Sequence, residues 1–364
     1  MDQSASPSNP IPTARALPLA PLSIAAAGLC CAVGHSLAAA SAAIRAGMDH
    51  FQESQYVTQE GYRLLTARLP DDTLWGKARL ARWISLAIAD CLRGLAVLDT
   101  RQIPVIWLAP EQERAGYDAD WYREAFDLAL HQLQASFHTH SGVLPHGRAG
   151  LAPALQQAAN WIASGEVQQV LLVGADSLLE APTINAYLQA HRLQAPGNVD
   201  GFIPGEAAAA LLLTTASLAP TGLVLCGAGM ALEPGRIDGS VPSRAQGLSA
   251  AIRAALAAAN LDFAALDFRF SDQNGESFYA KEAANALSRV TPVHGHQLRL
   301  MTLADCLGEV GAATGPAMLA YLHSLRQKRG HYRPPLGPTG LLHLANDNGL
   351  RSAVVVEYPA DLPE

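Results

Sequence analysis

The sequence predicts a layered α/β protein made of two similar halves. Its 364 residues are more than one ordinary domain needs and suit two domains or two fused halves. Along the chain, amphipathic helical segments alternate with short apolar runs typical of buried strands. Because the second part of the chain resembles the first in this alternation, we expect an internal duplication. The predicted division is a flexible tail over 1–20, an N-terminal half over 21–220 and a C-terminal half over 221–364.

The first half begins with a strand and a helix. Ser23–Gly28 is predicted to be a buried strand that ends at a glycine, and Ser36 is a suitable N-cap for a helix through Ala46. Further helices are expected at 77–98, 119–137 and 151–164, and further strands at 103–108, 169–173 and 207–213.

The second half repeats this alternation. Strands are expected at 223–229, 268–270 and 353–357, and helices at 243–259, 278–289 and 311–326. The proline- and glycine-rich stretch 330–340 is predicted to be a loop near the end of the chain.

Composition narrows the possible functions. Apolar residues make up 49% of the chain and charged residues 16%, which supplies a large core and suggests that a partner covers part of the surface. The net charge of -7 and the lack of any lysine or arginine run argue against binding to nucleic acid. No apolar run is long enough to cross a bilayer, so no membrane partner is expected.

The cysteines and the N-terminus indicate a cytoplasmic protein. The cysteines at positions 30, 31, 91, 226 and 306 form no C-x-x-C pair, as expected for thiols in a reducing compartment. The apolar stretch 17–34 follows no basic region and is interrupted by Pro18 and Pro21, unlike a signal peptide.

Two ordered segments carry a more specific signal. Residues 158–177 read AANWIASGEVQQVLLVGADS, and residues 201–213 read GFIPGEAAAALLL. They resemble the β-ketoacyl synthases, in which a helix, an SGE turn and an LVGG strand precede F-x-P-G-E-G-A-A. Segments 23–46, 250–262 and 307–312 resemble further parts of that family in the same order. The order and spacing of several segments make the resemblance stronger than any single motif.

The resemblance covers about residues 21–358 and implies a thiolase fold, five-layered αβαβα with two duplicated halves. Members of the family are usually dimers, and the active enzymes condense acyl groups through an acyl-cysteine intermediate. That chemistry needs a thiolate at a helix N-terminus and two histidines that stabilise the developing oxyanion.

The resemblance places these catalytic groups on residues of other types. The cysteine position falls on Arg148 or a close neighbour, the first histidine on Ser271 or Asp272, and the second on Asp305. The expected lysine is replaced by Leu300, and the terminal glycine-rich loop becomes the stretch 347–352. Arginine stays protonated and cannot be the nucleophile. We therefore predict a pseudoenzyme that lacks the Cys-His-His set.

A group of residues is expected to converge on the former catalytic pocket. They are His146, Arg148, Asp272, Asn274, Glu276, Asp305, Cys306 and Glu309. Two interpretations are open: a new site for a polar small ligand, or a salt-bridged plug in which Asp272 or Asp305 pairs with Arg148. We favour the plug, because a buried arginine requires an acidic partner. Cys306 is either a displaced nucleophile or, as is more common, a small core residue.

Two histidine groups have spacings that metal sites use. His138, His140 and His146 lie close together, and His294 and His296 form an H-x-H pair. Neither group has the further ligand that a site needs, so we predict no metal and no cofactor.

These features predict a catalytically inactive protein that acts by protein–protein interaction. The expected partners are a second copy, a second synthase-like chain, an acyl carrier protein, or a secretion adaptor or effector, with type VI effector loading as the most specific version. One alternative is an acyltransferase or condensing enzyme that uses Cys306, Ser271 or His146. The other alternative is a module that binds an acyl group or another small molecule.

Overall fold

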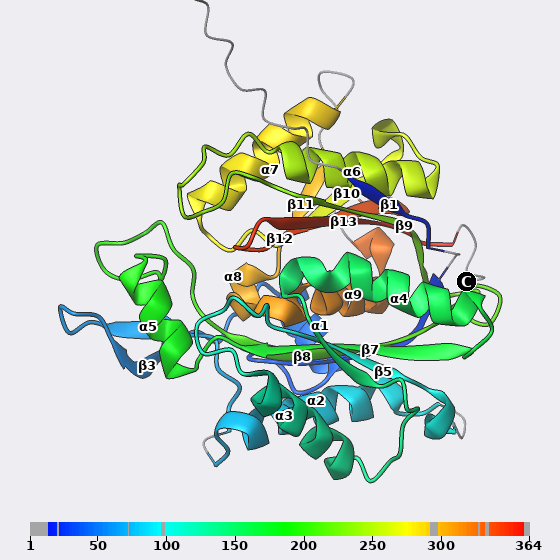
Figure 1. Cartoon of the computed structure of the whole chain (residues 1–364), viewed down its shortest axis with the longest axis horizontal. Coiled ribbons are helices and arrows are strands. Elements are labelled where there is room, and N and C mark those ends of the chain that lie inside the picture. The colour runs from blue at the N-terminus through cyan, green and yellow to red at the C-terminus, as the bar shows by residue number, and fades with distance from the viewer. Residues whose placement is uncertain are drawn as a thin grey trace, which may run out of the picture.

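The computed structural model describes residues 14–19, 22–71, 73–95, 99–291, 298–326, 328–331 and 335–359. Within these ranges, helices and strands stack as layers in the order α, β, α, β, α, seen edge-on in Figure 1. The predicted five-layered α/β fold is therefore confirmed.

Helices cover both outer faces and fill the space between the two sheets. One outer face carries α2 (Gly76–Leu92) and α3 (Ala119–Gln132), and the other carries α6 (Gln246–Ala259) and α7 (Ser277–Val290). The middle of the molecule holds α4 (Leu151–Ala163) and α9 (Thr314–Leu325), with α1 (Leu37–Arg45) and α8 (Ala304–Leu307) beside them. Nearly every residue of α9 is buried, as expected for a helix enclosed by two sheets.

The main strands of the two sheet layers are hydrogen-bonded to one another in one continuous order, from β11 to β6. One layer has the order β2 (Leu22–Cys31), β8 (Glu206–Thr215), β7 (Gln169–Ser177), β5 (Val105–Ala109) and β6 (Gly142–Pro145). The other has the order β9 (Leu223–Leu232), β13 (Leu350–Glu357), β12 (Thr339–Ala345), β10 (Phe268–Ser271) and β11 (Arg299–Met301). The layers join where residues 22–24 of β2 pair with 223–225 of β9.

In each half of the chain, a glycine in a strand allows an outer helix to pack closely on the sheet. A side chain at Gly28 of β2 would overlap the α2 backbone at Ala87, and one at Gly229 of β9 would overlap the α6 backbone at Ala251. Glycine in the middle of each strand therefore lets an outer helix approach its sheet closely. These matching positions are consistent with a duplication, and the predicted boundary at 220 lies in the turn between β8 and β9.

Some elements differ from the prediction. Residues 15–17, expected in the flexible tail, form β1 (Arg15–Leu17), which pairs with β9 because Leu17 is buried in the core. The structure also contains the hairpin of β3 (Gln52–Val57) and β4 (Arg63–Thr66) and the helix α5 (Ala181–Gln189), none of which was predicted. Each of these sequences is too short to show a long apolar period.

Candidate functional site

Arg148 lies where a tight turn meets a middle-layer helix. It begins η2 (Arg148–Gly150), a single 3-10 turn that leads directly into α4. The preceding Gly147 has a φ of 61°, a conformation that favours glycine. The Arg148 side chain is only 8% exposed. A guanidinium buried to this extent requires acidic or carbonyl partners.

Three carboxylates surround Arg148. Its Nη1 donates to Oε2 of Glu309 at 2.5 Å, its Nη2 lies 3.6 Å from Oδ1 of Asp347, and its Nε lies 3.9 Å from Oδ2 of Asp272. The guanidinium carbon also lies 5.2 Å from the ring centre of Tyr279, within cation–π range. Asp272 is thus a partner of Arg148 as predicted, but Glu309 makes the shorter contact.

Backbone amides hold these carboxylates in place. Glu309 accepts a hydrogen bond from the N–H of Gly311 at 2.8 Å, and Asp272 accepts one from the N–H of Ala345 at 2.7 Å. Burial raises the pKa of Asp272 to about 6, although the charge of Arg148 acts in the opposite direction. The side-chain amide of Asn274 donates to Glu309 at 2.8 Å.

A second arginine, Arg192, shares an acid with Arg148. Its Nε and Nη2 donate to the two carboxylate oxygens of Glu276 at 2.7 and 2.9 Å, and its Nη1 donates to Asp347 at 2.6 Å. Asp347 accepts a further hydrogen bond from the hydroxyl of Tyr279 at 2.5 Å. Burial acts to raise the pKa of Asp347, but the two arginines outweigh it and hold that pKa well below its usual range.

A third arginine, Arg114, forms a separate group of ion pairs beside the first and next to β7. Arg114 pairs with Asp176 at 2.7 Å and with Glu111 at 3.0 Å. Asp176 is fully buried and accepts a hydrogen bond from the N–H of Ala312 at 2.8 Å. Burial raises the pKa of Asp176.

Together these residues form two neighbouring ionic groups, which we call the arginine plug. Asp347 joins Arg148 and Arg192 in one group, Arg114 forms the other, and both groups line the same small cavity. Its members are Arg114, Arg148, Arg192, Glu111, Asp176, Asp272, Glu276, Glu309 and Asp347. Among these acids, burial raises the pKa of Asp176 and Asp272, whereas the arginines lower the pKa of Asp347.

The turn between β12 and β13 clamps the start of α4. Oδ1 of Asn346 accepts a hydrogen bond from the N–H of Ala149 at 2.8 Å, and its Nδ2 donates to the carbonyl of His146 at 2.7 Å. Arg351 supports this turn by donating to the carbonyl of Asn346 at 2.7 Å, while its Nε lies 3.0 Å from Glu282. The position of Arg148 is therefore fixed from both halves of the chain.

Several predicted site residues do not join the plug. Asp305 was expected as a partner of Arg148, and this is wrong: it is exposed on α8 and accepts a hydrogen bond from Thr302 at 2.9 Å. His146 has an exposed side chain and contributes only its carbonyl. Cys306 packs into the apolar core, where burial raises the pKa of its thiol. Ser271 is buried, and its hydroxyl accepts from the N–H of Gln273 at 3.2 Å.

Five plug residues were not predicted as site residues: Glu111, Arg114, Asp176, Arg192 and Asp347. Asp347 carries a signal in the sequence, since it begins the stretch that the resemblance aligns with a glycine-rich loop of the β-ketoacyl synthases. Arg114 and Arg192 carry no such signal, because each comes from a loop outside the segments that show the resemblance. Only the folded chain brings them to the carboxylates they neutralise.

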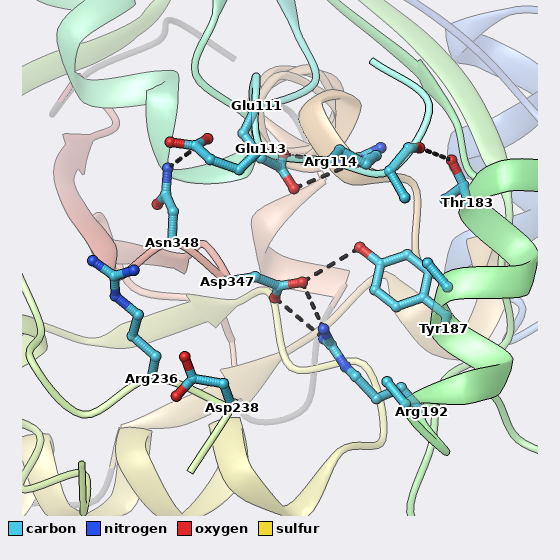
Figure 2. A pocket seen from close by; sticks show the side chains of 13 residues that line it. Glu111, Glu113, Arg114, Thr183, Tyr187, Arg192, Arg236, Asp238, Asp347 and Asn348 are labelled. Carbon is cyan, nitrogen blue, oxygen red and sulfur yellow. Dashed lines mark hydrogen bonds and ion pairs between the residues drawn. The ribbon is translucent and has the colours of Figure 1, made fainter. Parts of the chain in front are cut away.

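Little space remains around Arg148. The cavity there has a volume of about 10 Å³ and is lined by residues that include Arg148, Asn274 and Glu309. A volume of that size holds about one water molecule. A larger cavity of about 370 Å³ lies against the plug and is shown in Figure 2.

The histidines do not form a metal site in the described chain. The rings of His138 and His140 lie 4.6 Å apart, and Nδ1 of His140 is 3.7 Å from Glu166. Within the described ranges, no group of three or more His, Cys, Asp or Glu side chains is placed to hold a metal ion. His294 and His296 lie outside the described residues. None of the helices in the described ranges has the length and apolarity needed to cross a membrane.

Comparison with solved structures identifies the fold. A chain of AntDE:AntF, a type II PKS acyl-carrier protein in complex with its ketosynthase, is similar with a TM-score of 0.77 and 14% identity over 93% of this chain and 99% of that chain. An oxazolomycin ketosynthase domain from Streptomyces albus is similar with a TM-score of 0.74 and 16% identity over 94% and 75%. The ishigamide ketosynthase/chain length factor is similar with a TM-score of 0.67 and 15% identity over 93% and 99%.

These similarities confirm the predicted thiolase fold of the ketosynthase type. At such low identity they concern the fold alone. A scan against protein-family models and a search of curated proteins gave no match.

Proposed function

We propose that this chain is a catalytically inactive β-ketoacyl-synthase-like protein that acts by binding other proteins. One observation carries the proposal. The position that the resemblance assigns to the nucleophilic cysteine holds Arg148, whose guanidinium is buried against Glu309, Asp347 and Asp272.

The chemistry of the plug supports the absence of condensation. A guanidinium remains protonated in a protein and attacks no thioester. Acyl transfer through cysteine needs a thiolate and a nearby base. The residues that line the small cavity at Arg148 include no cysteine, serine or histidine in the part of the chain that the structure describes. Its volume of about 10 Å³ also leaves no room for an acyl chain.

The sheet edge at β6 supports association with a second chain. On its inner side β6 pairs with β5, and no other described strand pairs with its outer side. Its residues are half-buried, including Val143 and Leu144. An open edge with apolar side chains is a template for another strand. We therefore propose a homodimer, or a heterodimer with a second synthase-like chain, formed through this edge.

The similar structures suggest the kind of partner. One of them is described as a ketosynthase/chain length factor, and another as an acyl-carrier protein in complex with its ketosynthase. We propose that this chain is the silent subunit of such a pair or an adaptor for a carrier or secretion protein. Type VI effector loading remains the most specific version of this proposal.

Capture of partners from the native cell tests the proposal. The full chain, tagged at one end, is expected to retain a synthase-like chain, a carrier protein or a secretion component, identified by mass spectrometry. Val143→Lys on β6 is expected to remove the second chain, whereas Leu128→Lys on the outer helix α3 serves as the matched control. Circular dichroism verifies that both variants fold. A chain that stays monomeric in light scattering and retains no partner would contradict the proposal.

A further inference from the structure

The cavity of about 370 Å³ beside the arginine plug has the size of a small-molecule site. Its walls come from the loop 111–115, from α5 and Arg192, from the loop 236–238 and from the turn 347–348, as Figure 2 shows. It is distinct from the former nucleophile position, because the plug fills the space between them.

On the side of the cavity formed by the plug, the arginines have no hydrogen-bond donor free to bind a ligand. The guanidinium nitrogens of Arg192 all donate to Glu276 or Asp347. Those of Arg114 all donate to Glu111 or Asp176. A ligand would gain little from arginines whose hydrogen-bond donors are already used.

The rim of the cavity carries charges that lack partners of opposite sign. The exposed Arg236 makes no side-chain hydrogen bond or ion pair with any residue that the structure describes. It lies over the β12–β13 turn, since a Cβ at Gly349 would be 3.3 Å from its Nε.

Two carboxylates line the same cavity. Glu113 accepts a hydrogen bond from the amide of Asn348 at 3.3 Å. Asp238 accepts hydrogen bonds from the N–H and hydroxyl of Ser240 in its own loop. The charge of Arg236 acts on Asp238, but among the described residues Arg236 forms an ion pair with neither acid, so charges of both signs can still pair with a bound molecule.

The opposite wall is apolar. Ala186 of α5 and Ala190, which caps the end of that helix, line the cavity beside the ring of Tyr187. Burial raises the pKa of Tyr187, so its hydroxyl stays neutral at physiological pH. This wall suits an aliphatic group rather than a further charge.

We propose that this cavity binds a compact zwitterion of the amino-acid class. The carboxylate of the ligand pairs with Arg236, its ammonium group with Glu113 and Asp238, and its aliphatic side chain lies against Ala186 and Ala190. Binding is reversible and involves no covalent step. It needs no partner protein, so it stands or falls separately from the proposed interaction function.

Binding to the purified full chain tests this inference. A thermal-shift screen of the standard amino acids at millimolar concentration is expected to find an aliphatic one that stabilises the protein, and calorimetry then gives its affinity. The methyl ester of that amino acid lacks the carboxylate, and its N-acetyl derivative lacks the ammonium group. Each is expected to bind at least about tenfold more weakly, as expected for the loss of one ion pair.

Matched variants locate the site. Arg236→Gln is expected to weaken binding of the amino acid about tenfold and to leave binding of the methyl ester unchanged. Glu113→Gln is likewise expected to weaken binding of the amino acid about tenfold and to leave binding of the N-acetyl derivative unchanged. Arg244→Gln, in the same exposed loop but outside the cavity, is expected to bind as the unaltered chain does. The inference is wrong if no amino acid binds, if both derivatives bind as tightly as the parent, or if Arg236→Gln has no effect.

Discussion

The guanidinium of Arg148 and the carboxylate of Glu309 lie 2.5 Å apart, although 161 residues separate them in the chain. The pair connects the start of α4 to the loop after α8, and neither side chain is more than 8% exposed. Because both charges are removed from water, each depends on the other for its stability. The pair is thus a fixed part of the fold.

Removal of Glu309 is expected to destabilise the protein strongly. In Glu309→Ala, Arg148 keeps only its longer contacts, and a buried charge without its nearest partner costs about 3 kcal/mol. Urea unfolding measures the loss. The matched control is Asp120→Ala, which breaks an exposed pair with Arg123 and is expected to change stability by less than about 1 kcal/mol. Equal losses in the two variants would contradict the buried pairing.

The raised pKa of Asp272 predicts a dependence of stability on pH. The pKa is about 6 in the folded chain and 3.8 for the ordinary group, so the folded state binds the proton more tightly between these values. This contribution to stability is present below pH 4 and is lost as the pH rises through 6. Asp272→Asn has no such loss, so its stability relative to the unaltered chain should increase by about 1–3 kcal/mol from pH 4 to pH 7.

Denaturant unfolding at several pH values measures that difference. Arg148, Glu309 and Arg351 also face Asp272, and they are unchanged in the comparison. A difference that stays constant with pH would show that Asp272 titrates normally.

His343 predicts the opposite dependence. Burial and the nearby charge of Arg269 together lower its pKa to about 3, so His343 stays neutral in the folded chain at pH values where the unfolded chain binds a proton. Stability is therefore lost as the pH falls from 6.5 toward 3. His343→Gln should lose less stability over this range, which thermal unfolding at pH 7 and pH 5 can measure. Parallel curves for the two proteins would contradict a neutral buried His343.

The close packing of α2 on β2 predicts a sharp contrast between two glycines. Gly28→Ala places a methyl group on the carbonyl of Ala87, so the helix must move, and overpacking of this kind costs about 1–3 kcal/mol. Gly142→Ala on β6 meets no atom within 4 Å and has no left-handed φ, so it should be tolerated. Unfolding midpoints measure both, and a tolerated Gly28→Ala would contradict the close approach.

The sequence predicted most elements of the layers because these elements have strong periods, but it did not predict the strands β6, β11 and β12. β2, β7 and α4 are nearly where expected, and the Ser36 cap is present. The plug was predicted in principle from Arg148 and Asp272, since a buried arginine needs an acid. Its full extent was not predictable, because Arg114 and Arg192 come from loops without a periodic pattern. Asp305 was misplaced because the turn at α8 exposes it and brings Glu309 inward instead.

The most direct test of the central claim is intact-mass analysis after incubation with acyl-CoA and acyl-carrier substrates. The account predicts that the mass of the chain stays unchanged, since the resemblance assigns the nucleophile position to Arg148 and the cavity beside Arg148 has a volume of only about 10 Å³. Cys226→Ala, which removes a partly exposed thiol far from the plug, controls for nonspecific acylation. A stable acyl adduct that survives in Cys226→Ala and disappears in Cys306→Ala would show a working nucleophile and contradict the pseudoenzyme claim.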